Sequence, residues 1–208
     1  MLLDAASLYY RAFYGVPTSV TGPHGRPVNA VRGFLDMTAR LVVAHTPQRL
    51  VACWDDDWRP AFRVAALPTY KAHRVAPAGG EETPEELAPQ VPWLVDVLAA
   101  AGLTRVGAHG YEADDVIGTL ATRARGPVDV VTGDRDLFQL VDDERGVRVL
   151  YTARGINDLE FVDEAAVAAK YDIPGRSYAD FAVLRGDPSD GLPGVAGVGA
   201  KTAAALIN

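Results

Sequence analysis

Cysteine is nearly absent from this sequence, and its scarcity excludes several kinds of protein. The single cysteine among 208 residues, Cys53, rules out an internal disulfide and is typical of a reducing compartment. It follows the apolar run 50–52, so we expect a small buried residue rather than a nucleophile. No cluster of histidine and cysteine has the spacing of a zinc site.

Long hydrophobic runs are also missing. No apolar stretch approaches the roughly 20 residues that a transmembrane helix requires, so we expect no membrane partner. Residues 1–15 include Asp4 and lack the basic start of a signal peptide. Hydrophobic residues make up 49% and charged residues 23%, which is ordinary for a globular chain with one core, or one core and a small appendage.

Positive charge is scarce as well. The net charge is −7, which argues at first against a nucleic-acid partner, and only three of the 20 basic residues are lysines. The segment 58–80, however, contains no acid and carries Arg59, Arg63, Lys71, His73 and Arg74. Such a segment can bind phosphates when bound cations cancel part of the acidic charge nearby. The alternative is a solvated basic helix face, and spacing alone does not separate the two.

What the sequence does contain is carboxylates in short clusters. Like charges at close range repel and raise one another's pKa, so clustering is not explained by stability. Hard divalent cations, which prefer oxygen ligands, do explain it. The sequence therefore predicts a site for two or more Mg²⁺ or Mn²⁺ ions. The candidate metal ligands are Asp4, Asp55, Glu112, Asp114, Asp115, Asp134, Asp136, Asp187 and Asp190.

Short β-rich runs alternate with helical patterns along the chain. Strands are expected at 2–3, 50–54, 128–132 and 147–151, and helices at 30–44, 85–101, 114–125 and 163–171. This alternation predicts an α/β fold with a mostly parallel sheet and helices on both faces. Active sites of such sheets lie beyond the carboxyl ends of the strands, which is where Asp4, Asp55 and Asp134 fall. The segment 75–84, rich in Pro, Gly and Ala, is expected to be a mobile loop.

Each motif also has a purely structural interpretation. Acids at 112–115 fit helix capping, and the acid pairs at 134–136 and 187–190 fit turns. The glycine-rich segment 194–202 fits a structural turn, or a hairpin whose backbone N–H groups hold a phosphate; Ala200 breaks the P-loop register. The aromatic residues at 9, 10, 13 and 14 suit either the core or base stacking.

Taken in order, these motifs resemble the bacterial 5′ nuclease family, the flap-endonuclease-like 5′–3′ exonucleases that include the N-terminal nuclease domain of DNA polymerase I. The resemblance covers essentially the whole chain. The matching motifs are Leu3-Asp4, Trp54-Asp55, Phe62-Arg63, Tyr70-Lys71-x-x-Arg74, Tyr111-Glu112-Ala113-Asp114-Asp115, Thr132-Gly133-Asp134-Arg135-Asp136-Leu137, Gly186-Asp187-x-Ser189-Asp190 and Leu192-Pro193-Gly194-x-x-Gly197-x-Gly199-x-Lys201-Thr202.

The resemblance implies a PIN-like (resolvase-like) core over residues 1–183, with a helical arch at about 59–92. Residues 184–208 would form the start of a helix-hairpin-helix-type duplex-binding element, which would hold a K⁺ ion. It places five of the acids, Asp4 to Asp115, in a first metal group and the other four in a second. Lys71 and Arg74 would be the catalytic residues that contact the scissile phosphate. The implied DNA-binding residues are Arg63, Tyr70, Gly194, Gly197, Gly199, Lys201 and Thr202.

The implied activity is metal-dependent hydrolysis of DNA with free 5′ ends or 5′ flaps, in replication and repair. The implied setting is the bacterial cytoplasm, at the nucleoid, with a DNA polymerase as partner in cis or in trans. The chain departs from the family at Gly191, where Asn is usual, and in the extra acids Asp56 and Asp57. It ends inside the second helix of the duplex-binding element, so we expect a longer parent chain. Three alternatives stay open at this point: a PIN-type ribonuclease, a non-catalytic DNA-binding module and, more distantly, a DxD phosphatase.

Overall fold

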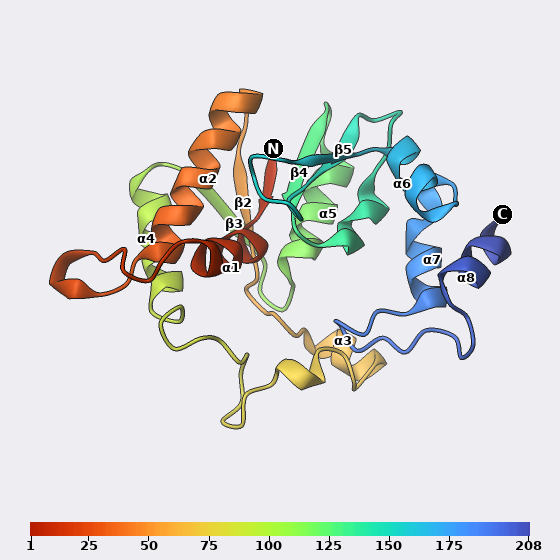
Figure 1. Cartoon of the computed structure of the whole chain (residues 1–208), viewed down its shortest axis with the longest axis horizontal. Coiled ribbons are helices and arrows are strands. Elements are labelled where there is room, and N and C mark those ends of the chain that lie inside the picture. The colour runs from red at the N-terminus through yellow and green to blue at the C-terminus, as the bar shows by residue number, and fades with distance from the viewer.

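A six-stranded sheet forms the centre of the structure, a computed structural model that describes residues 1–208 (Figure 1). The strands lie in the order β3-β2-β1-β4-β5-β6, and all neighbours are parallel except β5 and β6. The expected mostly parallel α/β sheet is therefore confirmed. Its strands are β1 (Leu2–Asp4), β2 (Val51–Trp54), β3 (Thr104–Gly107), β4 (Val128–Thr132), β5 (Val147–Tyr151) and β6 (Glu160–Val162).

Helices cover both faces of this sheet (Figure 1). One layer contains α1 (Ala5–Gly15), α2 (Asn29–His45) and α4 (Gln90–Ala100). The other contains α5 (Ala113–Arg123), α6 (Glu164–Tyr171), α7 (Tyr178–Arg185), α8 (Ala200–Ile207) and the 3₁₀ helix η3 (Arg135–Leu140). Successive strand residues point to opposite faces, so Leu2 belongs to the core under α5 and Leu3 to the core under α1 and α2.

The segment between β2 and α4 leaves the sheet at its carboxyl edge. It contains α3 (Ala61–Ala66) and the short 3₁₀ helix η2 (Ala72–Arg74). The hairpin between α7 and α8 runs beside it (Figure 1), and the amide of Lys71 donates to the carbonyl of Asp190 at 2.9 Å. The remaining 3₁₀ helices are η1 (Pro23–Gly25) and η4 (Gly175–Ser177). No helix is both long enough and apolar enough to cross a lipid bilayer.

Element boundaries agree with the sequence predictions where local chemistry is decisive. The strands expected at 128–132 and 147–151 are present with those bounds. The helix expected from residue 85 begins instead at Gln90. Pro89 has no N–H, and inside a helix its ring would meet the carbonyl of Glu85, so residues 84–88 form a separate turn closed by Leu87 N–H on Pro84 O at 2.9 Å.

Several elements were not predicted, and α1 is the most consequential. Asp4 is the last residue of β1 and the N-cap of α1, where its carboxylate accepts from the amide of Ser7 at 3.1 Å. Strand and helix therefore follow each other with no turn residue to mark the change. The segment 75–84 lies outside helices and strands as expected, and it is closed by a bridge between Val75 and Glu81.

Candidate metal centre

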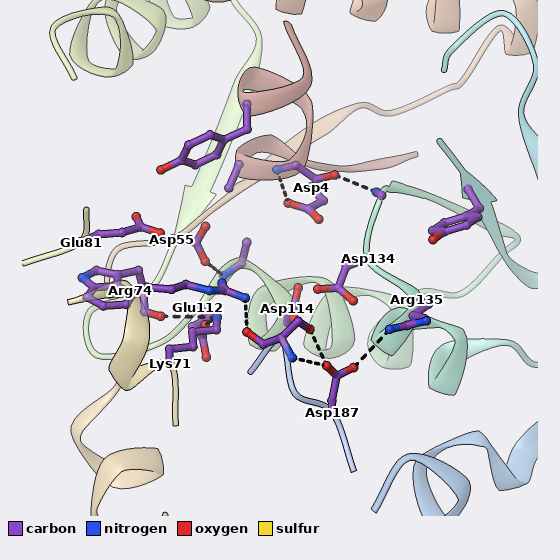
Figure 2. A pocket seen from close by; sticks show the side chains of 18 residues that line it. Asp4, Asp55, Lys71, Arg74, Glu81, Glu112, Asp114, Asp134, Arg135 and Asp187 are labelled. Atoms are coloured by element: carbon purple, nitrogen blue, oxygen red, sulfur yellow. Dashed lines mark hydrogen bonds and ion pairs between the residues drawn. The ribbon is translucent and has the colours of Figure 1, made fainter. Parts of the chain in front are cut away.

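A cavity of about 410 Å³ lies beyond the carboxyl ends of the central strands. Asp4 enters it from β1, Asp55 follows β2, and Asp134 follows β4, as parallel strand ends require. The start of α5 and the loop after α7 supply the other acids. Figure 2 shows the predicted ligands that line this cavity: Asp4, Asp55, Glu112, Asp114, Asp134 and Asp187.

The other three predicted ligands lie in a neighbouring cavity of about 600 Å³. Asp115, Asp136 and Asp190 line it, and Asp114 borders both cavities. Asp115 also caps α5, because its carboxylate accepts from the amide of Glu112 at 3.0 Å. The structure thus brings six of the nine acids into one cavity and the rest into the next, and helix capping accounts for part of what Asp115 does.

Burial dominates the electrostatics of the main cavity. Burial, together with the charges of Asp55 and Asp134, raises the pKa of Asp4 to about 7 against two opposing hydrogen bonds. The pKa of Asp114 lies well above its usual range for the same reasons, burial first and then the charge of Asp4. No ion pair to Asp4, Asp55, Asp114 or Asp134 is present. A buried carboxylate without a counter-charge is costly, so a bound cation would stabilise this group.

The donors present fit a hydrated divalent ion. The available metal-ligand atoms are all carboxylate oxygens. One of these oxygens, Asp136 Oδ1, is buried with no hydrogen-bond partner. No three acidic, histidine or cysteine side chains converge closely enough to hold one ion directly. The acids instead stand around a cavity with room for water, and Mg²⁺ retains several waters when it is bound by one or two carboxylates.

The basic residues predicted for catalysis also reach the cavity. Lys71 and Arg74 both line it, at either end of η2. Lys71 Nζ contacts Glu112 Oε1, and Arg74 donates to Asp190 Oδ1 and to the carbonyl of Ser189, each at 2.7 Å. Both cations are therefore neutralised by acids of the predicted metal groups.

Glu112 is the centre of a network with the segment between β2 and α4, where the arch is expected and which is called the arch below. Besides Lys71, it accepts from the hydroxyl of Tyr70 at 2.6 Å and pairs with Arg63 at 2.9 Å. Arg63 also forms two hydrogen bonds with Asp115, both 2.8 Å. Tyr70 is only 8% exposed, and in this structure the polar groups of Tyr70 and Arg63 contact Glu112 and Asp115. Their direct contact with DNA stays a prediction.

The remaining predicted DNA-binding residues lie on the surface between α7 and α8. Gly199 is the N-cap of α8, and Lys201 and Thr202 lie in its first turn. Gly194 and Gly197 belong to the hairpin and have positive φ angles of 65° and 79°. The hairpin thus lies between two short helices, α7 and α8, and its assignment as the duplex-binding element stays a prediction.

Sequence reasoning missed some residues of the cavity. Glu81 lines it from the loop 75–84, and burial, followed by the charge of Asp55, raises its pKa. Arg135 lies between two predicted ligands and approaches Asp187 at 3.9 Å. In the sequence, the only signals for these two residues are that Glu81 is an acid in a predicted loop and that Arg135 is a base within an acidic motif. Of the three consecutive acids after β2, only Asp55 lines the cavity, while Asp56 pairs with Arg105 at 3.0 Å; the role of Asp55 as a metal ligand stays a prediction.

The aromatic residues of α1 divide between core and surface. Tyr9 and Phe13 are buried, Tyr10 lines the main cavity, and Tyr14 is 73% exposed. Core packing, one of the two interpretations, therefore holds only for Tyr9 and Phe13.

A mostly parallel sheet with carboxylates gathered beyond its strand ends defines a resolvase-like α/β protein with an acidic, hydrolase-type centre. The family model for the 5′-3′ exonuclease N-terminal resolvase-like domain matches residues 1–172. The chain belongs to this 5′-3′ exonuclease family and is a nuclease.

Relatives and solved structures agree with this assignment. A 5′-3′ exonuclease of Streptomyces coelicolor is 64% identical over 212 residues, covering 100% of this chain and 70% of the relative. A 5′-3′ exonuclease of Mycobacterium tuberculosis is 56% identical over 219 residues, covering 100% and 69%. DNA polymerase I of the same species is 46% identical over 211 residues, covering 100% and 22%.

Solved structures support the fold. The T5 D15 protein co-crystallised with metal ions is 17% identical with a TM-score of 0.75, covering 100% of this chain and 73% of that one. The catalytic core of Rad2 in complex with DNA substrate is 17% identical with a TM-score of 0.59, covering 100% and 60%. At these identities the likeness establishes the fold.

Proposed function

We propose that this chain is a structure-specific 5′ nuclease that hydrolyses DNA at free 5′ ends and 5′ flaps with the help of Mg²⁺ or Mn²⁺. The observation that carries this proposal is the main cavity itself. Four acids without ion-pair partners, the buried Asp4 and the partly buried Asp55, Asp114 and Asp134, face Lys71 and Arg74 across one hollow. This arrangement suits a reaction in which cations are bound on one side and a phosphate on the other.

Each group of residues has a distinct part in this mechanism. The six acids of the main cavity would hold the ions, and Asp136 and Asp190 of the adjacent cavity would support the second metal group. Divalent ions bound there supply an activated water and stabilise charge on the reacting phosphate. The lining residues include no histidine or cysteine that could activate a protein nucleophile, which agrees with direct attack by water.

Lys71 and Arg74 would bind the oxygens of the scissile phosphate. In the absence of substrate they bind Glu112 and Asp190 instead, so a DNA phosphate must compete with these carboxylates. Pairing with Glu112 and Asp190 keeps both side chains charged and close to the cavity before DNA arrives. It therefore reduces the cost of ordering them when the substrate binds.

The hairpin between α7 and α8 would hold the duplex. Exposed backbone N–H groups near Gly199, together with Lys201, suit phosphates without regard to sequence, and a K⁺ ion would complete this site. We further propose that the enzyme acts in replication and repair at the bacterial nucleoid, in the cytoplasm, with a DNA polymerase in cis or in trans. The core at 1–183 and the duplex-binding element at 184–208 would be its two functional parts.

Cleavage of 5′-labelled flap, nicked and single-stranded DNA with Mg²⁺ or Mn²⁺ tests the proposal. Lys71→Ala should lower the single-turnover rate by about 10²-fold or more with little change in flap affinity, as expected for one lost electrostatic donor. Arg148→Ala is the control, because Arg148 lies on β5 and pairs with Asp129 outside both cavities. Preferential cleavage of single-stranded RNA, or metal-independent DNA binding without cleavage, would contradict the proposal.

A further inference from the structure

The turn formed by residues 187–191 presents three consecutive carbonyl groups to the base of the arch. The carbonyl of Ser189 accepts from Arg74 at 2.7 Å, and that of Asp190 accepts from the amide of Lys71 at 2.9 Å. The carbonyl of Gly191 accepts from the hydroxyl of Thr69 at 3.0 Å. Two segments more than 100 residues apart are thus joined by one backbone–backbone hydrogen bond at Lys71 and by a side-chain hydrogen bond on either side of it.

Only glycine fits at the last of these positions. Gly191 has a φ of +76°, and a Cβ placed on it would lie 2.3 Å from the carbonyl oxygen of Thr69. That oxygen belongs to the backbone and cannot rotate away as a flexible side chain would. The glycine that departs from the family pattern is therefore the residue that lets the turn approach the arch.

The turn itself is held firmly in shape. The amide of Asp187 donates to the carbonyl of Leu192 at 3.0 Å, and the amide of Leu192 donates to the carbonyl of Asp187 at 2.8 Å. The carboxylate of Asp187 accepts from the amide of Ser189 at 2.8 Å. The turn follows α7 directly and precedes the hairpin, so its position is set by the element that we propose binds the duplex.

We infer that Gly191 is a positioning residue, and that the turn 187–191 is a socket that seats the arch base and aims Lys71 and Arg74 at the cavity. The inference rests on the proposed function. It links the duplex-binding hairpin to the phosphate-binding residues through hydrogen bonds to three backbone carbonyl groups, without a contact between Gly191 and the substrate. The residue that seats the arch is thus distinct from the residues that act on the phosphate.

Gly191→Ala is the direct test. An added Cβ must move about 1 Å away from Thr69 O to reach ordinary contact, and a displacement of that size costs about 10²-fold in rate when it misplaces a catalytic group. We expect that loss in single-turnover cleavage at saturating flap DNA and Mn²⁺, with Mn²⁺ affinity unchanged. Gly102→Ala is the matched control, because Gly102 has a φ of +68° and open space around its Cβ position.

A combined variant distinguishes positioning from general damage. If Gly191 acts through Lys71 and Arg74, then adding Gly191→Ala to a protein that already carries Lys71→Ala and Arg74→Ala should not slow cleavage further. Rate losses that multiply would overturn the inference, as would a Gly191→Ala protein that cleaves like Gly102→Ala. Thr69→Val serves if Gly191→Ala does not fold. It removes one hydrogen bond from the exposed side of the socket and should slow cleavage by about five-fold, and an unchanged rate would refute the socket.

Limited trypsin digestion separates the socket from the proposed function. Without DNA or metal, Gly191→Ala should be cut after Lys71 and Arg74 several times faster than the parent protein and Gly102→Ala. If the parent protein cleaves no DNA, the proposed function fails. The digestion rate alone then tests whether the turn 187–191 holds the arch base in place. Equal digestion of the three proteins would then refute it.

Discussion

Replacing Glu112 tests whether this carboxylate anchors the arch or only serves as a metal ligand. Its side chain is 3% exposed, accepts hydrogen bonds from Tyr70 and Lys71, and forms an ion pair with Arg63. A ligand role predicts that its loss matters only when metal is bound. An anchoring role predicts that the metal-free protein is destabilised as well.

The size of the effect follows from the partners that Glu112→Ala would leave behind. The hydroxyl of Tyr70 would lose a bond to a charged acceptor, worth roughly 1.5–3 kcal/mol. Lys71, 12% exposed, would lose its carboxylate, whereas Arg63 would keep its two bonds to Asp115. Removing a buried acid whose own pKa is raised by burial offsets part of this loss. We therefore expect a net cost of about 2–3 kcal/mol, or a fall in Tm of roughly 4–12 °C for a chain of this size.

Thermal and urea unfolding in the presence of a chelator measure this cost. Glu112→Gln is the matched control, since its amide oxygen still accepts from Tyr70 while the charge facing Lys71 is lost, and its fall in Tm should be about half as large. Tyr70→Phe removes the hydroxyl alone. If Glu112→Ala unfolds like the parent protein in chelator and differs only with Mn²⁺ present, the anchoring role is wrong.

Other predictions follow from the same cavity. Because burial raises the pKa of Asp4 from 3.8 to about 7, its contribution to stability is present below the lower value and is lost as pH rises through the upper one. Melting curves should show the metal-free protein losing stability over that interval and millimolar Mn²⁺ restoring it; a Tm that rises with pH in chelator would contradict this. Asp114→Asn should lower hydrolysis by about 10²–10³-fold at any Mg²⁺ concentration, while Asp190→Asn should give a smaller loss that added Mg²⁺ partly reverses. Equal losses in a Mg²⁺ titration would argue against two metal groups. An added Cβ at Gly199 meets nothing of this chain within 4 Å, so Gly199→Val should fold normally yet bind duplex DNA more weakly across a salt titration; unchanged affinity would show that the duplex is held elsewhere.

The sequence alone determined four of the six strands, all but β3 and β6, and the location of the cavity. Runs of β-branched residues bounded by turns, such as 128–132, define strands through local chemistry. Parallel strands then bring their carboxyl ends to one edge, which places Asp4, Asp55 and Asp134 together whatever the intervening helices do.

The division of the acids between two cavities was decided by tertiary structure. Residues 114 and 115 are neighbours in sequence, but a helix rotates by about 100° per residue. Asp114 therefore borders the main cavity while Asp115 meets Arg63, which comes from a segment 52 residues away. No local pattern shows that the cations of the arch neutralise the acids of the site.

Position 191 shows the same limit most clearly. In the sequence, position 191 is simply a glycine in a predicted turn, and glycine is common in turns for purely local reasons. Only the folded chain brings Thr69, 122 residues away, so close that a single methyl group at Gly191 would collide with its backbone. Local propensities act over a few residues, and contacts between distant segments exist only after the sheet and its two helical layers have packed.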